Sequence, residues 1–286
     1  MLSKIYRGTK KAHYLHEFGV SYFSILSSLP SNKEISLNID GMEMKMRVRT
    51  AMYLAMLLHE IKSSGWNVKS ENGEIVFENG NIKLYSNDIF YAGTINEVFV
   101  REVYKSNIKG KVVIDVGAYF GETAIYFALQ GAKKVVALEP DEDAYKFALR
   151  NVKENKLEDR ITLLNKAVAP RCSKVNYYKA PGTASSTDYE NMFYKERDKV
   201  IAVKQVEAVT LDEAISMVEE RIGLLKMDCE GCEYSVLNSF SGFDKIDEII
   251  LEYHNGLQNL PSLLKSYGFK VIAKGDRLGI LRANRI

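Results

Sequence analysis

The sequence predicts an α/β protein built on a doubly wound, mostly parallel β-sheet, preceded by a small α+β region. Two observations lead to this fold class. The β-branched run Val112–Val116 meets a glycine-containing turn and passes into an apolar helix, as the first strand, turn and helix of an open α/β sheet do. A second apolar run, Val135–Leu138, ends at Glu139, and strand and helix patterns continue to alternate after it.

The residues before this sheet show short elements of both kinds. Apolar residues at steps of three and four predict an amphipathic helix over Leu15–Leu29. Its polar face is rich in serine rather than basic residues, which favours ordinary packing over a membrane-surface helix. Hairpin turns are expected at Asp40-Gly41 and Asn79-Gly80, and a helix capped by Thr50 between them. We expect residues 1–90 to form a cap or a homo-oligomerisation unit.

A second domain is expected over residues 91–286, with the boundary near residues 87–93. Thr94 and Glu97 have capping-box spacing, which predicts a helix before the first strand of the sheet. Residues 177–199 form an irregular polar insertion, typical of an active-site lid or acceptor loop. The other expected elements are helix Glu122–Gln130, a helix capped by Asp141, strands Ile161–Leu164 and Leu224–Met227, a short helix from Cys232, strand Glu248–Tyr253, helix Leu260–Ser266, and a final antiparallel pair of strands, Phe269–Ile272 and Leu278–Arg282.

Composition limits the possible functions. The 286 residues are 46% hydrophobic and 27% charged, which excludes a disordered chain. A net charge of +2 gives no general electrostatic reason to bind nucleic acid or an anionic membrane. No apolar stretch is long enough to span a bilayer, and 3 cysteines are too few for a disulfide framework. We therefore expect a cytoplasmic protein without a transmembrane segment.

The turn after the first strand indicates the class of ligand. Gly117 and Gly121 do not have the G-x-G-x-x-G spacing that lets the backbone approach a dinucleotide pyrophosphate. Asp115 at the strand end would repel a phosphate, whereas it favours a cationic ammonium or sulfonium. Glu139 ends the next strand at the same sheet edge and can accept both hydroxyls of a ribose. A nucleoside that carries an amino acid and no phosphate fits this pattern, and S-adenosylmethionine is such a molecule.

The same stretch resembles the first motifs of class I S-adenosylmethionine-dependent methyltransferases. Three later segments, Val209–Glu213, Leu224–Glu233 and Ile250–His254, narrow the resemblance to the FkbM family of O-methyltransferases. The resemblance runs from about Tyr91 to the C-terminus and implies a seven-stranded, Rossmann-like sheet with S-adenosylmethionine as cofactor. The expected cofactor-binding residues are Asp115, Gly117, Ala118, Gly121, Thr123, Glu139, Pro140, Ala167 and Asp228.

Methyl transfer to a hydroxyl calls for a base, because sugar hydroxyls are very weak acids. Asp228 and Glu230 follow one predicted strand and His254 ends the next, so pairing of these strands would bring the three to one edge about 5 Å apart. We predict that His254 is the base and that Asp228 or Glu230 orients its imidazole. As ordinary alternatives, His254 is a hydrogen-bonded structural residue and the two acids cap the following helix.

A divalent metal is a competing interpretation of this cluster. Asp228, Glu230, Glu233 and His254 offer ligands that suit Mg, Mn or Ca, but Glu233 can instead face solvent, and a metal is not favoured. Cys229 and Cys232 have C-x-x-C spacing. The sequence shows neither a second pair for zinc nor a thioredoxin-like context, so we expect both to be packing residues.

The leading hypothesis is an O-methyltransferase that acts on a hydroxyl of a sugar, a glycan or another small polyhydroxylated acceptor. The acceptor class comes from the family resemblance alone. An RNA methyltransferase is the second hypothesis, disfavoured because the acidic turn Asp228–Glu233 would repel a phosphodiester and no basic stripe is present. A non-catalytic S-adenosylmethionine-binding scaffold protein is the third. An NAD-dependent enzyme is the least favoured, because the glycine spacing is wrong.

Overall fold

The computed structural model describes residues 14–21, 24, 28, 31–180, 185–192 and 198–286. The chain divides into two compact units, Met1–Val103 and Tyr104–Ile286. This division comes later in the chain than the boundary expected near residues 87–93, so the helical residues 91–100 belong to the first unit.

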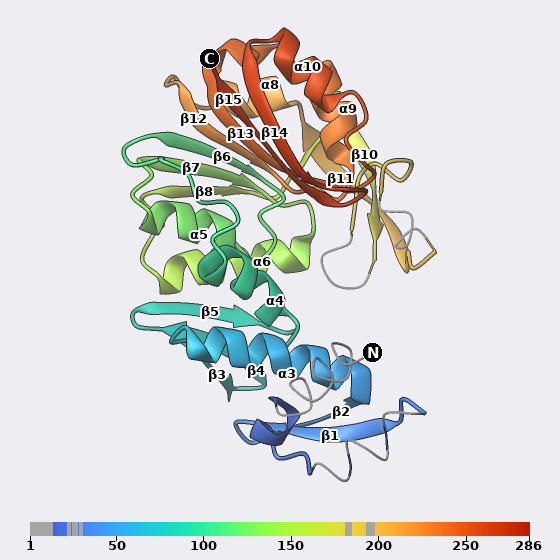
Figure 1. The fold of residues 1–286 in the computed structure, drawn as a ribbon. Coiled ribbons are helices and arrows are strands. Elements are labelled where there is room, and N and C mark those ends of the chain that lie inside the picture. Colours follow the sequence, from blue (N-terminus) through green and yellow to red (C-terminus); the bar gives the residue numbers. More distant parts are fainter. Residues whose placement is uncertain (1–13, 22–23, 25–27, 29–30, 181–184, 193–197) are drawn as a thin grey trace. The chain divides into compact units, whose positions relative to one another are not determined.

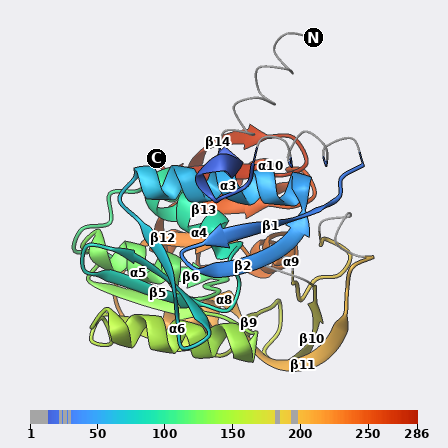
Figure 2. The same cartoon turned by 90° about the horizontal axis from the view of Figure 1, so that it is seen from below.

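The first unit combines a long helix with two small antiparallel sheets. β1 (Glu34–Ile39) and β2 (Met42–Arg47) form the hairpin predicted around Asp40-Gly41, and α3 (Val48–Ser63) lies along it (Figures 1 and 2). The second sheet contains β3 (Asn67–Glu71), β4 (Glu74–Asn79) and β5 (Ile82–Ser86) in that order, and α4 (Tyr91–Ile95) and the π-helical turn η1 (Asn96–Val100) follow it.

Three expectations for the first unit are wrong in detail. The helix predicted from Leu15 is interrupted, because residues 14–17 are helical but Gly19 has a φ of 79°, a left-handed conformation that ends helices. Tyr22, Ile25 and Leu29 of that prediction lie outside the described residues. The helix α3 begins at Val48 without a side-chain cap, and Thr94 lies inside α4 rather than capping it.

The second unit contains the predicted seven-stranded sheet. Its order is β14-β15-β13-β12-β6-β7-β8. Six strands run in one direction, and β15 runs antiparallel to its two neighbours, β13 and β14. The strands are β6 (Val112–Val116), β7 (Lys134–Leu138), β8 (Ile161–Leu164), β12 (Ile222–Met227), β13 (Ile246–Tyr253), β14 (Phe269–Gly275) and β15 (Gly279–Arg285). The chain reverses its direction of travel across the sheet between β6 and β12, and ligands bind at such switch points in open α/β sheets.

Helices cover both faces of this sheet (Figure 1). One face carries α5 (Glu122–Leu129) and α6 (Glu142–Glu154), and the other carries α8 (Leu211–Ser216), α9 (Cys232–Ser239) and α10 (Leu260–Ser266). Because both faces are buried, β6 and β12 are buried at every position, and this explains why their apolar runs were visible in the sequence. Asp141 caps α6 as predicted, accepting the N–H groups of Asp143 and Ala144. Among the residues that the structure describes, no helix combines the length and apolar character needed to cross a membrane.

A separate three-stranded sheet interrupts the alternation after β8. It consists of β9 (Ala167–Val168), β10 (Lys174–Lys179) and β11 (Ala202–Val209), in the order β10-β11-β9. The strands β10 and β11 were not predicted, because most of their side chains are exposed or half-buried and their apolar residues do not alternate regularly. The expected insertion 177–199 therefore begins inside β10, and residues 181–184 and 193–197 lie outside the described part of the chain.

The turn after β6 yields a test of the fold. Gly117 has a φ of 78°, and a Cβ atom there would lie 1.8 Å from the Asp228 carbonyl oxygen. Gly110 has a similar φ of 74° but nothing within 4 Å of its Cβ position. Alanine in this conformation costs about 1–2 kcal/mol at either site. We expect Gly117→Ala to lower the unfolding temperature much more than Gly110→Ala, because only Gly117→Ala also forces the backbone to move. Equal losses in thermal unfolding would contradict the close contact.

Candidate functional site

Most of the predicted site residues gather at the carboxyl edge of the sheet, at the switch point between β6 and β12. The turns after these two strands are tied together, since the Asp228 N–H donates to the Val116 carbonyl over 3.0 Å and Gly117 packs against the Asp228 carbonyl. The parallel pairing of β12 with β13 brings His254, the residue after β13, to the same edge. The predicted convergence of Asp228, Glu230 and His254 is therefore present in the structure.

The glycine turn is held by short polar contacts and close packing. The Thr123 hydroxyl donates to Asp115 Oδ2 over 2.5 Å, and both side chains are buried. Gly121 precedes α5 with a φ of 84°, and a Cβ atom there would press on Ala148 of α6 at 3.3 Å. Ala118 is fully buried, and its N–H donates to a carbonyl of β7. This turn is consequently fixed before any ligand binds.

A buried lysine that the sequence analysis missed supports the same turn. Lys226 Nζ donates to the Gly117 carbonyl over 2.6 Å and lies 3.1 Å from Asp115 Oδ1. Burial alone would lower the pKa of Lys226, but the Asp115 and Asp228 carboxylates outweigh burial and raise that pKa, so the ammonium stays charged. The sequence contained a signal for this residue, because Lys226 is the one charged side chain within the apolar strand Ile222–Met227.

Glu139 directly follows β7, and its side chain is buried. Its carboxylate accepts the backbone N–H groups of Tyr119 over 2.8 Å and of Asp141 over 2.7 Å. Burial raises the pKa of Glu139 to about 8 in spite of these two bonds. The Asn165 amide donates to the carbonyls of Glu139 and Pro140, which fixes the path of the chain after the strand.

Ala167 follows the end of β8 by three residues. It belongs to β9, pairs with Ala208 of β11, and is buried with Ala169 in a small cluster of its own. The structure thus places Ala167, one of the expected cofactor-binding residues, in the three-stranded sheet, and its contact with the cofactor stays a prediction.

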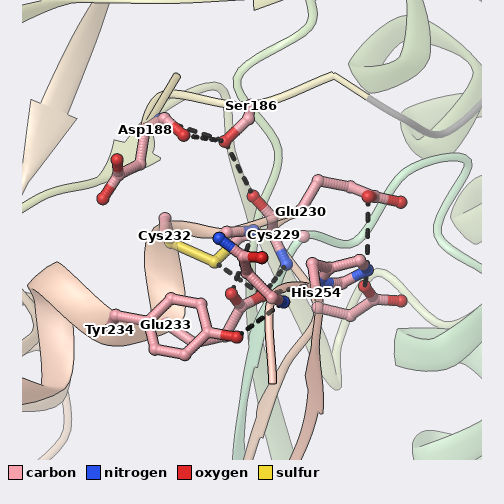
Figure 3. Close-up of polar contacts among 12 residues, drawn as sticks. Ser186, Asp188, Cys229, Glu230, Cys232, Glu233, Tyr234 and His254 are labelled. Atoms are coloured by element: carbon pink, nitrogen blue, oxygen red, sulfur yellow. Dashed lines mark hydrogen bonds and ion pairs between the residues drawn. A yellow bond between two sulfur atoms is a disulfide. The ribbon is translucent and has the colours of Figure 1, made fainter. Parts of the chain in front are cut away.

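His254 is the centre of the acidic part of the site and is only 3% exposed (Figure 3). Its Nε2 lies 3.2 Å from Glu230 Oε2 and 3.7 Å from Asp228 Oδ1, and its Nδ1 faces Glu233 Oε1 at 3.5 Å. Burial alone would lower the pKa of His254, but the three carboxylates outweigh burial and hold the pKa well above its usual value. The imidazole is therefore protonated at neutral pH and accepts a proton only at higher pH.

The acids around His254 are positioned in three different ways. Asp228 Oδ2 accepts the Tyr104 hydroxyl over 3.1 Å. Glu230 has a φ of 57°, which is uncommon for a residue with a side chain. Glu233 is fully buried and accepts two backbone N–H groups of the turn before α9, both at 2.9 Å. Glu233 thus satisfies these N–H groups and does not face solvent. The start of α9 has no side-chain cap, so neither Asp228 nor Glu230 takes the capping role that was the alternative.

Cys229 and Cys232 form a disulfide in this turn, so the expectation that both are unpaired packing residues is wrong (Figure 3). The left-handed conformation of Gly231, with a φ of 119°, helps to bring the two Cα atoms to 5.4 Å. The pair lies at the junction of β12 and α9, the strand and helix that the sequence predicted, but the pairing itself was not expected. Cys232 is buried in the core, Cys229 is half-buried, and Cys172 is free and exposed.

Three side chains of this region are close enough to hold a cation. Asp228, Glu252 and His254 each have one donor atom within 4.8 Å of the others. This set contains Glu252, which the sequence analysis did not name. Oxygen and nitrogen donors of this kind suit Mg or Mn, and the expectation that no metal is bound stays a prediction.

A groove lies beside Ser235 of α9, lined by residues of β10, by residues 187–190, and by Ala169 and Pro170. The rings of Tyr178 and Tyr189 lie 5.0 Å apart on its wall. Ser186 connects this wall to the acidic turn, because its hydroxyl accepts the Asp188 N–H over 3.0 Å and donates to the Cys229 carbonyl over 3.5 Å (Figure 3). The polar residues of the groove are Asn176, Thr187, Asp188, Glu190 and Ser235.

Comparison with known proteins identifies the family. The model of the methyltransferase FkbM domain matches residues 115–271, which is more than half of the chain. The ribosomal protein L11 methyltransferase of Carboxydothermus hydrogenoformans is 51% identical over 55 residues, which are 19% of this chain and 18% of that protein. An uncharacterized protein, 158B, of Sulfolobus islandicus rod-shaped virus 1 is 26% identical over 166 residues, which are 57% of this chain and 74% of that protein.

Among solved structures, an FkbM methyltransferase from Methylobacillus flagellatus KT aligns with 66% of this chain and 47% of its own, at 15% identity and a TM-score of 0.46. The chain thus spans less than half of that structure and less than a fifth of the L11 methyltransferase. The residues matched by the family model contain both the glycine turn and the acidic cluster around His254. This protein therefore belongs to the FkbM family of methyltransferases, for which S-adenosylmethionine is the cofactor.

Proposed function

We propose that this protein transfers the methyl group of S-adenosylmethionine to a hydroxyl of a sugar, a glycan or another small polyhydroxylated acceptor. The observation that carries the proposal is the contact between the glycine turn after β6 and the acidic cluster around His254. The glycine turn packs against Asp228, and Asp228 lies beside His254. A sulfonium held by that turn would face a group able to accept a proton, which is the alignment that displacement by a hydroxyl requires.

The cofactor would lie along the carboxyl ends of β6 and β7. Asp115 is fully buried and already paired with Lys226 and Thr123, so we assign it a positioning role for the glycine turn rather than direct contact with the cofactor ammonium. Glu139 would accept the ribose hydroxyls. The residues that we propose to lie against the cofactor are Gly117, Ala118, Gly121, Thr123, Glu139, Pro140, Ala167 and Asp228, and Asp115 supports them from behind the glycine turn.

His254 is the proposed base. The acceptor oxygen attacks the methyl carbon, its proton moves to His254 Nε2, and the electron pair of the carbon–sulfur bond leaves with S-adenosylhomocysteine. Glu230 and Asp228 face Nε2 and would orient the imidazole and stabilise its positive charge as it forms. The same carboxylates hold the proton on the imidazole at neutral pH, so the base is active only after this proton is lost.

The groove beside α9 supports a polyhydroxylated acceptor. Aromatic faces such as those of Tyr178 and Tyr189 can pack against the apolar face of a sugar ring, while carboxylates such as Asp188 accept its hydroxyls. Ser186 joins this groove to the turn that precedes α9. An RNA acceptor is disfavoured, because its phosphates would meet the carboxylates of Asp228 and Glu230.

The first unit is proposed to act as a cap or a homo-oligomerisation unit. Light scattering on the full-length chain would determine its oligomeric state.

The experiment that tests the function uses methyl-labelled S-adenosylmethionine and a host extract separated into glycan, small-molecule, RNA and protein fractions. His254→Ala serves as the inactive variant, and His59→Ala, a histidine substitution in the first unit, serves as its matched control. We expect label in the glycan or small-molecule fraction with wild type and His59→Ala only. Label in RNA or protein would instead identify an acceptor of that class, and label in no fraction would favour a binding protein.

The raised pKa of His254 predicts the pH dependence of the reaction. We expect kcat/KM to rise with pH through a pKa above the usual range for histidine, because the imidazole must be neutral to accept a proton. Glu230→Gln removes one of the stabilising carboxylates and should shift this rise to lower pH. Steady-state rates across pH 6 to about 9.5 check both expectations. An unshifted profile in Glu230→Gln would exclude His254 as the titrating base.

Glu139 predicts a second pH effect, on cofactor affinity. Its carboxyl group is protonated below about pH 8, and ribose hydroxyls donate best to the carboxylate, so affinity should rise as pH increases through that value. Glu139→Gln should weaken binding roughly 10- to 100-fold and remove this pH dependence. The matched control is Glu142→Gln, which alters an exposed carboxylate on α6. Calorimetry with S-adenosylhomocysteine checks this, and wild-type affinity in Glu139→Gln would refute the ribose assignment.

A further inference from the structure

The disulfide Cys229–Cys232 lies within the acidic turn but has no part in the proposed methyl transfer. Asp228 immediately precedes Cys229, and Glu230 lies inside the small ring that the disulfide closes. Glu230 has a φ of 57°, and such a conformation persists in a residue with a side chain only where the surroundings enforce it. The covalent ring is one of these constraints, so opening it would release the backbone that aims Glu230 at His254.

Glu233 connects the sulfur atoms to His254 by a second route. Its Oε1 lies 3.4 Å from Cys229 Sγ and 3.5 Å from His254 Nδ1. In the disulfide the sulfur carries no hydrogen, so this contact is a van der Waals contact. A reduced Cys229 would donate its S–H to the carboxylate oxygen that faces the imidazole. Reduction would therefore add a competing donor at the oxygen nearest Nδ1.

The position of the pair also suits thiol–disulfide exchange. Cys229 is half-buried, whereas Cys232 is only 2% exposed and is the first residue of α9. A thiolate of a dithiol reductant would attack Cys229 Sγ, and Cys232 would leave as a thiolate at the helix N-terminus, where backbone N–H groups stabilise it. The second thiol of the reductant would then displace Cys229. Two electrons and two protons pass to the protein, and the reductant becomes a disulfide.

We infer that Cys229 and Cys232 form a reversible thiol–disulfide exchange site that takes dithiols as co-reactants and controls the geometry around His254. The disulfide form is the active one, because it holds Glu230 within 3.2 Å of His254 Nε2. Reduction frees Glu230, gives Glu233 a new donor, and lowers the rate of methyl transfer. That last statement rests on the proposed function, whereas the exchange and the change at His254 do not.

The first test needs no methyl acceptor. Full-length protein carrying Cys172→Ser is equilibrated with mixtures of reduced and oxidised dithiothreitol, and its thiols are counted by alkylation and mass spectrometry. We expect one two-electron transition that adds two alkyl groups. In histidine-labelled protein, the NMR signals of the His254 imidazole should move with the same midpoint. Cys229→Ala/Cys232→Ala in the same background should show neither change, and Cys229→Ser alone, which keeps the buried Cys232, should remove the two-thiol transition.

Three outcomes would overturn this inference. They are a disulfide that resists reduction until the protein unfolds, His254 signals that are identical in both redox states, and signals that still shift with redox state in the double variant.

Once an acceptor is known, reduction should lower kcat at least about tenfold, leave S-adenosylhomocysteine affinity unchanged, and be reversed by reoxidation. Equal rates in the two states would refute the control of activity. No methyl transfer in either state, together with a shift at His254, would instead refute the proposed function alone.

Discussion

The site depends on the close approach of two turns, the one after β6 and the one after β12. Gly117 lies so near the Asp228 carbonyl that only glycine fits there, and the Asp228 N–H closes the contact by donating to Val116. Parallel neighbours at a switch point bring two such turns together, and Lys226 reinforces the contact by donating to the Gly117 carbonyl. The glycine turn and the acidic cluster are therefore one structure, which is why we treat methyl donor and proton acceptor as neighbours.

The glycine turn and the cluster around His254 differ in net charge. Beneath the glycine turn, one carboxylate, Asp115, is matched by one ammonium, Lys226, so this part of the site is close to neutral. Around His254, three carboxylates face a single imidazole, which keeps its proton and leaves net negative charge. A cationic sulfonium is favoured near such a cluster and a phosphodiester is not. Asp228, Glu252 and His254 also meet the geometric requirement for a cation, although His254 would have to lose its proton to act as a ligand.

Much of the second unit could be predicted because its parallel strands are buried on both faces and appear as apolar runs. The order of Asp115, Glu139, Asp228 and His254 at strand ends then placed them on one edge. Features that depend on three-dimensional contacts could not be predicted from the sequence. The disulfide depends on the conformation of Gly231, and the role of Glu233 depends on the N–H groups that it accepts. The largely exposed strands β10 and β11 leave no periodic signal. Lys226 is visible in the sequence as a charge within an apolar strand, but its contacts with Asp115 and Gly117 depend on the packing of β12 against β6.

The central claim is that the glycine turn and His254 serve one reaction, and a crystal structure with S-adenosylhomocysteine tests it most directly. We predict that the ribose hydroxyls meet Glu139 and that the sulfur atom lies at the Asp228 side of the glycine turn. The gap between the sulfur and His254 Nε2 should hold one methyl group and one acceptor oxygen, with reacting atoms about 3–3.5 Å apart. A cofactor whose sulfur points away from His254, or that binds elsewhere on the sheet edge, would contradict the account.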